Sequence, residues 1–231
     1  QIKSAFGWDH GRIKSFLKLQ KKYDSTPKET DRFLHNLSVN GINGNKDYPL
    51  TESRPVENTL AEISDSSDYI VFIIGGKIQP KKWPLDNWVS LAKQIHDVDR
   101  ILLIGGEAEQ GQADYIVTRT DNTLSVCGLL SIPELSYVLK RAKAAVSLDT
   151  GAMHLCDATC TPAVVMFSAR ELSDKWYPGN SLSIVLEKNV PCSFCFKTRC
   201  EDNICMKQIS VDEVLQSLRQ ITGSTHDSQF S

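Results

Sequence analysis

Ala-Ala-Val-Ser-Leu-Asp-Thr-Gly-Ala-Met-His, residues 144–154, joins a predicted buried strand to the start of a predicted helix. A strand that turns into a helix at Gly151 directs backbone N–H groups and the positive end of the helix dipole to one edge of the sheet, where they favour an anion. Asp149 can accept hydrogen bonds from sugar hydroxyls, and His154 lies one turn into the helix. The stretch therefore indicates a site for a sugar phosphate or nucleotide sugar, or else an ordinary joint whose glycine only serves the turn.

Strands and helices alternate on both sides of this stretch. Apolar runs predict strands over 69–74, 101–104, 124–127, 144–148 and 163–167. Helical spacing predicts helices over 86–95, 108–118, 131–139, 153–159 and 210–221, the first capped by Asp86 and two opened by capping boxes at Ser131 and Ser210. This order predicts an α/β fold, a Rossmann-like parallel sheet with helices on both faces, whose ligands bind beyond the carboxyl ends of the strands.

Length and composition divide the chain unevenly. Its 231 residues and 41% hydrophobic content suffice for one good-sized domain, or for one domain and part of another. Residues 69–231 carry the alternating pattern. Residues 51–68 are polar and are predicted to be a linker, and residues 1–50 hold one convincing helix, which opens with a capping box at Thr26.

Charge and hydropathy exclude several classes of function. The formal net charge is −2 and the charges are well mixed, so nucleic acid is not an expected partner. No apolar stretch reaches the length of a membrane span, and no signal peptide is found. The chain begins at Gln1 in the middle of a pattern, so we expect it to be a fragment.

Two further loops follow predicted strands at the same edge of the sheet as Asp149. After the first strand come Gly75-Gly76 and then Lys77, Lys81 and Lys82, which can offer positive charge to phosphate. After the second strand, Gly105-Gly106 is followed by Glu107 and Glu109, which can hold ribose hydroxyls. The alternatives are a surface loop anchored by Trp83 and acidic residues that complement a helix dipole. Three such loops on one edge outline a single cleft.

Seven cysteines are many for a cytosolic protein. Cys127, Cys156 and Cys160 lie in apolar contexts and are expected in the core. The other four are clustered, and four thiolates can hold zinc. We expect a structural zinc site or free thiols in this cluster rather than disulfides, because no export signal supports an oxidising compartment. The clustered residues are Cys192, Cys195, Cys200 and Cys205.

The three loops follow one another along the chain in the order found in a known family. The chain resembles the C-terminal half of the ADP-heptose:lipopolysaccharide heptosyltransferases, glycosyltransferase family nine. The resemblance covers roughly Ile70 to Leu218. It is carried by the motifs Lys81-Lys82-Trp83-Pro84, Gly105-Gly106-Glu107-Ala108-Glu109, Gly128-Leu129-Leu130-Ser131-Ile132-Pro133-Glu134-Leu135 and Asp149-Thr150-Gly151-Ala152-Met153-His154, together with the late Cys192-x2-Cys195 and Cys205-Met206.

The resemblance implies a GT-B architecture in which residues 69–231 bind the nucleotide-sugar donor and residues 1–50 are the remnant of an acceptor domain. It implies inverting transfer of a sugar, heptose in this family, to a lipopolysaccharide-core-type acceptor. Lys81 would contact the diphosphate, Glu109 the ribose and Asp149 the transferred sugar, whereas Lys82 would point elsewhere. The full set of donor-binding residues expected is Gly76, Lys77, Lys81, Glu109, Leu130, Asp149, Thr150, Gly151 and His154.

Two departures from the family pattern bear on activity. The Gly-Asp strand–loop and the catalytic carboxylate base of the family's N-terminal domain have no counterpart in this sequence, so we expect this chain alone to be inactive in transfer. Ser168-Ala169-Arg170 also stands where members commonly have a glycine. Catalysis is expected to need no cofactor. The expected partners are the donor and a lipid-linked saccharide, which implies the cytoplasm and the inner face of the membrane.

Two other functions compete. Leu148-Asp149-Thr150-Gly151-Ala152 also spells the signature of aspartic proteases, but these need two such loops in an all-β fold. A non-catalytic module that retains affinity for the nucleotide sugar is the better alternative.

Overall fold

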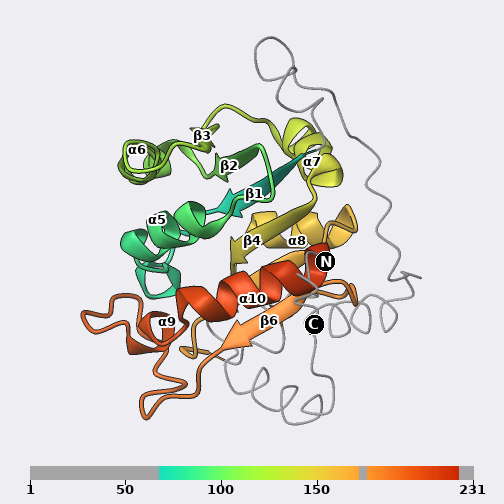
Figure 1. The fold of residues 1–231 in the computed structure, drawn as a ribbon. Coiled ribbons are helices and arrows are strands. Elements are labelled where there is room, and N and C mark those ends of the chain that lie inside the picture. The colour runs from blue at the N-terminus through green and yellow to red at the C-terminus, as the bar shows by residue number, and fades with distance from the viewer. Residues whose placement is uncertain (1–67, 172–175, 224–231) are drawn as a thin grey trace, which may run out of the picture. The chain divides into compact units, whose positions relative to one another are not determined.

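The computed structural model describes residues 68–171 and 176–223, and the strands and helices of these residues belong to one compact unit (Figure 1). Six strands form one sheet in the order β3-β2-β1-β4-β5-β6, and every neighbouring pair is parallel. The strands are β1 (Tyr69–Ile73), β2 (Arg100–Ile104), β3 (Thr123–Ser125), β4 (Ala144–Leu148), β5 (Ala163–Phe167) and β6 (Ile184–Glu187).

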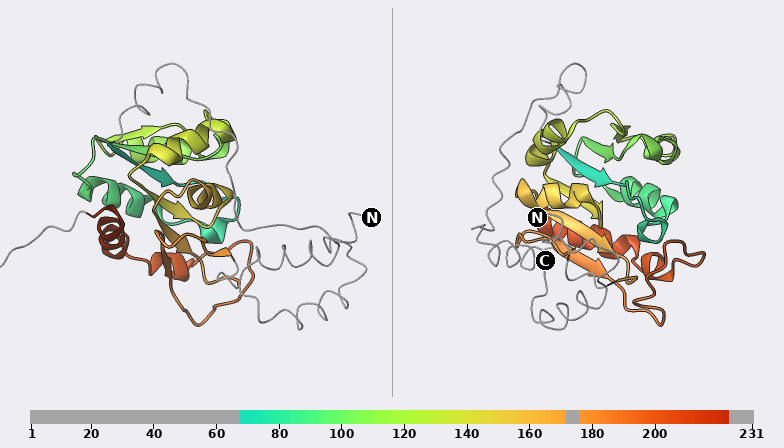
Figure 2. Two further views of the ribbon diagram at one scale, coloured as in Figure 1. Left: turned by 90° about the vertical axis from the view of Figure 1, so that its right-hand side faces the viewer. Right: turned by 180° about the vertical axis from the view of Figure 1, so that it is seen from behind.

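Helices connect the strands in the manner of a doubly wound fold. They are η2 (Gln79–Lys81), α5 (Leu85–Gln94), η3 (Glu107–Glu109), α6 (Gln110–Val117), α7 (Ile132–Arg141), α8 (Gly151–Ala158), α9 (Ile204–Lys207) and α10 (Val211–Thr222). Figures 1 and 2 show α5, α6 and α10 on one face of the sheet and α7 and α8 on the other. The α/β prediction, with a parallel sheet covered on both faces, is confirmed.

Successive side chains of β1 point to opposite faces of the sheet, and because they are apolar on both faces, helices must cover both. Ile70 and Phe72 point to the core under α5 and α10, and the Phe72 ring lies 5.1 Å from the Trp88 ring, centroid to centroid. Tyr69 points to the opposite face, where its hydroxyl donates to the carbonyl of Val138 in α7 at 2.7 Å. All five residues of β1 are buried, so the strand reads as a continuous apolar run.

The predicted elements overlap the observed ones to within about two residues, and three differences are larger or of another kind. The predicted strands 144–148 and 163–167 coincide with β4 and β5. β6 was not predicted because it is an edge strand whose four residues are all only partly buried. Asp86 does not cap α5, because Pro84 is the N-cap residue and the helix begins at Leu85. Asp86 lies in the first turn and accepts a 2.6 Å hydrogen bond from the Tyr115 hydroxyl. The third difference is β3, which is shorter than predicted.

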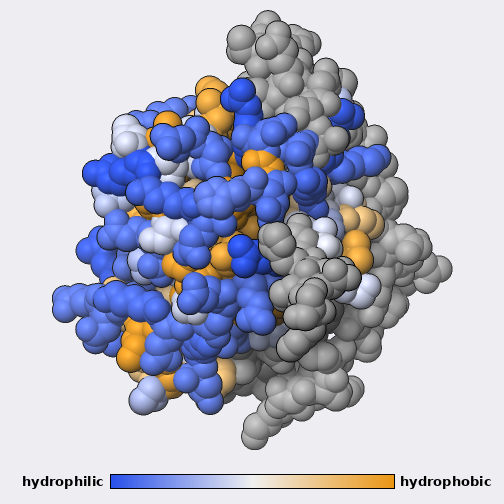
Figure 3. All heavy atoms as spheres, in the orientation of Figure 1, coloured by the Kyte–Doolittle hydropathy of each residue, from blue (hydrophilic) through white to orange (hydrophobic). Residues whose placement is uncertain are grey.

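The predicted remnant domain, residues 1–50 with the helix after Thr26, and nearly all of the predicted linker, 51–68, lie outside the described residues. Within the described part, no helix combines the length and the apolar character needed to cross a membrane. The side of the unit seen in Figure 3 is mostly hydrophilic over α5, α6 and α10, with small separate hydrophobic patches. This agrees with helices that bury one face against the sheet.

Candidate functional site

The strand order reverses between β1 and β4, and the loops after these two strands meet there. β1 connects onward to β2 on one side, whereas β4 connects to β5 on the other. A Cβ atom added to Gly76 would lie 3.8 Å from Cγ2 of Thr150, so the two loops are in contact. Such a reversal at the carboxyl ends of parallel strands is where open α/β sheets bind ligands.

The N-terminus of α8 faces this point. Thr150 is the N-cap residue and has extended backbone angles, φ −147° and ψ 170°, but its side chain makes no capping hydrogen bond. Its buried hydroxyl oxygen has no hydrogen-bond partner among the described residues. The first N–H groups of α8 lie outside the helix's own ladder, and a Cβ at Gly151 would meet no atom within 4 Å. The helix end therefore has open space in front of Gly151, and its binding of an anion stays a prediction.

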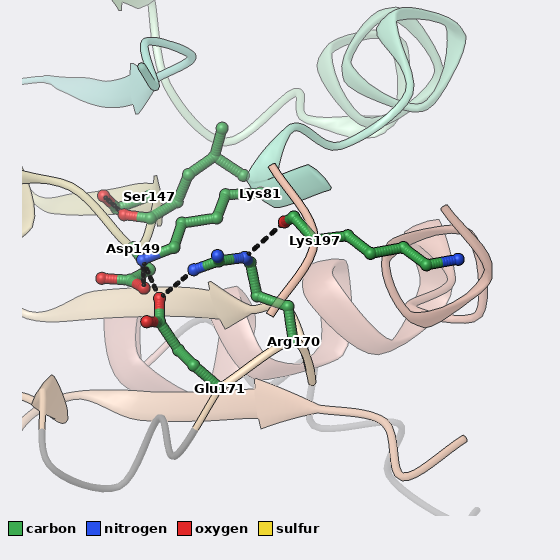
Figure 4. A network of polar contacts seen from close by, with 7 residues as sticks. Lys81, Ser147, Asp149, Arg170, Glu171 and Lys197 are labelled. Atoms are coloured by element: carbon green, nitrogen blue, oxygen red, sulfur yellow. Dashed lines mark hydrogen bonds and ion pairs between the residues drawn. The ribbon is translucent and has the colours of Figure 1, made fainter. Parts of the chain in front are cut away.

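Lys81 reaches across from η2 to the same place (Figure 4). Its ammonium is hydrogen-bonded to Oδ2 of Asp149 and lies 2.6 Å from Oε1 of Glu171. The same Glu171 oxygen lies 2.8 Å from Nη1 of Arg170. Two cations and two carboxylates thus alternate in one network, which leaves the group of four without net charge.

Burial and nearby charges shift the pKa of Glu171 in this network and of His154 close to it. Burial acts to raise the pKa of Glu171, but hydrogen bonds and charge from Lys81 and Arg170 hold that pKa below its usual value. Desolvation lowers the pKa of His154, one turn into α8, although the carboxylates of Asp149 and Asp157 oppose this effect. Glu171 is therefore ionised and His154 neutral at neutral pH.

A second ion pair lies at the end of β2. Nζ of Lys82 is 3.2 Å from Oε1 of Glu109, whose Oε2 accepts the backbone N–H of Gly106 at 3.1 Å. Glu109 is only 8% exposed, so its carboxylate is held in place. Gly105 makes room for it, because a Cβ there would lie 2.8 Å from Cβ of Glu109. Lys82 thus points away from the place that Lys81 reaches, and it contacts Glu109, the predicted ribose-binding residue.

Trp83 anchors the loop that carries both lysines. The ring is 2% exposed, and its Nε1 donates to the carbonyl of Ile209 at 2.9 Å. It packs edge-on against Trp88, with the ring centroids 5.2 Å apart. The Lys-Lys-Trp-Pro spacing therefore has a physical basis, because a buried indole fixes the two residues that precede it.

The structure brings most of the predicted site residues together, with two exceptions. Gly76, Lys81, Asp149, Thr150 and Gly151 surround the reversal point, and His154 lies within electrostatic reach of Lys81 and Asp149. Lys77 is exposed and has no ion pair with a described residue. Leu130 is half-buried in the turn after β3, two strands away from β1.

Arg170 and Glu171 were missed by the sequence analysis. They follow β5, so they lie at the same edge of the sheet as the residues that follow β1 and β4. A charged pair three and four residues after the end of a buried strand was the available signal. The sequence pattern alone shows only that Ser168-Ala169-Arg170 departs from the family.

The cysteines do not form the predicted zinc site. Cys192, Cys195, Cys200 and Cys205 are free thiols, ranging from exposed to buried. In residues 68–171 and 176–223, no group of three or more His, Cys, Asp or Glu is arranged to hold a metal ion. The segment instead supports η2, because the N–H of Cys200 donates to the Gln79 side chain at 2.9 Å.

The remaining three cysteines were expected in the core, and two of them are there. Cys127 and Cys156 are buried, and burial raises the pKa of the Cys156 thiol to about 12. Cys160 is exposed, with a left-handed φ of 56°, because it turns the chain between α8 and β5.

An aspartic protease is excluded by the surroundings of Asp149. The residue follows a strand of a parallel α/β sheet, and its partner is the Lys81 ammonium rather than a second aspartic acid. A protease dyad needs two carboxyl groups that share a proton.

The sequence model of Glycosyltransferase family 9 (heptosyltransferase) matches residues 6–205. The chain belongs to this family. A relative from Pseudomonas aeruginosa, Lipopolysaccharide heptosyltransferase 1, is 29% identical over 160 residues, which make up 67% of this chain and 44% of the relative. The chain thus spans less than half of the length of that relative.

Solved structures of the family have the same fold. A family 9 glycosyltransferase from Veillonella parvula superposes with a TM-score of 0.68 at 16% identity, over 87% of this chain and 61% of that one. The E. coli heptosyltransferase WaaC with ADP-2-deoxy-2-fluoro heptose gives 0.52 at 22% identity, over 74% and 51%. The described unit is therefore a Rossmann-like domain of the GT-B type.

Proposed function

We propose that the described domain binds the nucleotide-sugar donor of a heptosyltransferase. The complete activity would be transfer of a sugar, heptose by family likeness, to a lipopolysaccharide-core-type acceptor with inversion. One observation carries the proposal: a lysine ammonium and a carboxylate are paired beside the open N-terminus of α8, at the reversal point of the sheet.

Each part of the site suits one part of such a donor. The N–H groups of Gly151 and its neighbour, together with Lys81, would hold the diphosphate and stabilise it as the leaving group. Asp149 would accept hydroxyls of the transferred sugar. Glu109, fixed by Lys82 and Gly106, would accept ribose hydroxyls.

Adenosine diphosphate is the proposed nucleotide because structures of the related E. coli protein contain ADP and an ADP-heptose analogue. Lys81 and the helix end supply the charge that a bound cation supplies in other enzymes, so we propose that binding needs no metal ion. Leu130 would lie toward the base, because it follows β3, two strands away from β1 in the sheet.

The acceptor hydroxyl needs a general base. We assign that role to no residue of the described domain, where the carboxylates of Asp149, Glu171 and Glu109 are each paired with a lysine. A lipid-linked acceptor would place the reaction at the inner face of the membrane. We propose that this chain by itself binds the donor without transferring sugar to such an acceptor.

The proposal is tested by calorimetric titration of the purified chain with ADP-heptose, ADP and UDP in excess EDTA. We expect saturable binding of the two adenine nucleotides, tighter than that of UDP, with EDTA having no effect. Equal binding of UDP would overturn the assignment of the base, and loss of binding in EDTA would overturn the metal-free site. Incubation with ADP-heptose and a truncated lipid acceptor, followed by mass spectrometry, then tests the absence of transfer.

A further inference from the structure

Glu171 holds Lys81 from the side opposite to Asp149. One oxygen of Glu171 accepts from both Lys81, at 2.6 Å, and Arg170, at 2.8 Å, and Figure 4 shows the carboxylate between the two cations. The side chain of Lys81 is 13% exposed and that of Glu171 is 23% exposed. A negative charge therefore sits directly beside the cation that is proposed to meet the diphosphate.

Arg170 is fixed to the cysteine-containing segment. Its side chain is 8% exposed, its Nε donates to the carbonyl of Lys197 at 2.9 Å, and its Nη2 donates to that of Phe196 at 3.1 Å. In return, the N–H of Phe196 donates to the carbonyl of Arg170 at 2.9 Å, and that of Phe194 to Ala169 at 2.7 Å.

The two phenylalanines carry backbone strain at this contact. Their φ angles are 62° for Phe194 and 53° for Phe196, in the left-handed region that bulky residues rarely adopt. Residues hold such angles only when their surroundings determine them, and at this contact four hydrogen bonds do so. The guanidinium of Arg170 consequently has a fixed position from which to attract Glu171.

We propose that Glu171 is a counter-ion that weakens the grip of Lys81 on the donor diphosphate, and that Arg170 limits this effect by sharing the carboxylate. The inference rests on the proposed function. A diphosphate beside Lys81 is repelled by Glu171 and competes with it for the ammonium. With Arg170 present, Glu171 remains paired after the diphosphate has taken Lys81. The arrangement keeps the nucleoside diphosphate from binding so tightly that product release stalls.

The sign of two substitutions tests this inference. Glu171→Gln keeps the shape of the side chain and removes its charge, so ADP should bind on the order of threefold to tenfold more tightly. Adenosine, which has no phosphate, should bind as it does to the unaltered chain. Arg170→Met should weaken ADP binding more in the original background than in the Glu171→Gln background, because part of its effect acts through that carboxylate.

Glu201→Gln is the matched control, since it removes one exposed carboxylate from the cysteine-containing segment. Calorimetry with ADP and adenosine gives the affinities, and thermal melting reports folding. Weaker or unaltered ADP binding in Glu171→Gln, with the unaltered chain binding ADP, would overturn the inference alone. Failure of the unaltered chain to bind ADP would overturn the proposed function and the inference with it. If Arg170→Met does not fold, the Glu171→Gln result decides by itself.

Discussion

Replacing Lys81 with methionine removes the cation of the proposed diphosphate site while keeping the length of the apolar stem. In the structure the ammonium forms ion pairs with the carboxylates of Asp149 and Glu171 and partly offsets their negative charge. Its loss leaves the four-member network with a net charge of −1 where a diphosphate has to bind. A charge-assisted hydrogen bond is worth about 1.5–3 kcal/mol, so the Kd for ADP should rise roughly tenfold to 150-fold.

Calorimetric titration with ADP and with adenosine measures this effect, because only ADP carries the phosphates. Adenosine should bind to the variant with nearly its original affinity. Lys93→Met is the matched control: Lys93 lies on α5, is exposed, and has no ion pair with a described residue. An equal loss of affinity for ADP and adenosine would refute the argument, as would an equal loss of ADP affinity in both variants.

Three other substitutions extend the test to the sugar, the ribose and the fold. Asp149→Ala should weaken binding of ADP-heptose by about 1.5–3 kcal/mol but that of ADP much less, and equal calorimetric losses would show that Asp149 does not serve the sugar. Gly105→Ala puts a Cβ 2.8 Å from that of Glu109, so adenosine affinity should fall, and denaturant titration should show a loss of about 1–3 kcal/mol in unfolding free energy; unchanged values would contradict this placement. A hydrogen bond from Lys188 lowers the pKa of Glu213 below its ordinary 4.5, so its carboxylate stabilises the fold above that pH, and the contribution is lost as the pH falls through the lowered value. Glu213→Gln should therefore flatten the acid limb of the curve of unfolding free energy against pH, and a limb of unchanged slope would contradict the assignment.

The sheet could be predicted from the sequence because its strands are buried on both faces. β4 and β5 are runs of five buried residues, and such runs have no other plausible place in a domain of this size. β6 escaped prediction because an edge strand with partly exposed residues lacks that signal. The prediction that Asp86 caps the helix failed for a different reason. α5 begins after Pro84 without a side-chain cap, because tertiary packing holds the helix in place.

The sequence predicted the site residues that stand out within a single loop, but not the contacts between loops. Asp149 and Lys81 were recognised because each follows a strand and carries a charge suited to a donor. Their pairing, and the position of Glu171 between two cations, depend on the loops after β1, β4 and β5, which the sheet brings to one edge. The same limit applies to the cysteines, since spacing of four thiols along the chain does not specify whether their sulfur atoms converge.

The most direct test of the donor site is a crystal structure of the chain with ADP. We expect the diphosphate at the N-terminus of α8, with its oxygens about 2.7–3.1 Å from the N–H of Gly151 and from Nζ of Lys81, and the ribose hydroxyls on Glu109. An ordered ADP molecule elsewhere on the described domain, with Lys81 still held between Asp149 and Glu171, would contradict it.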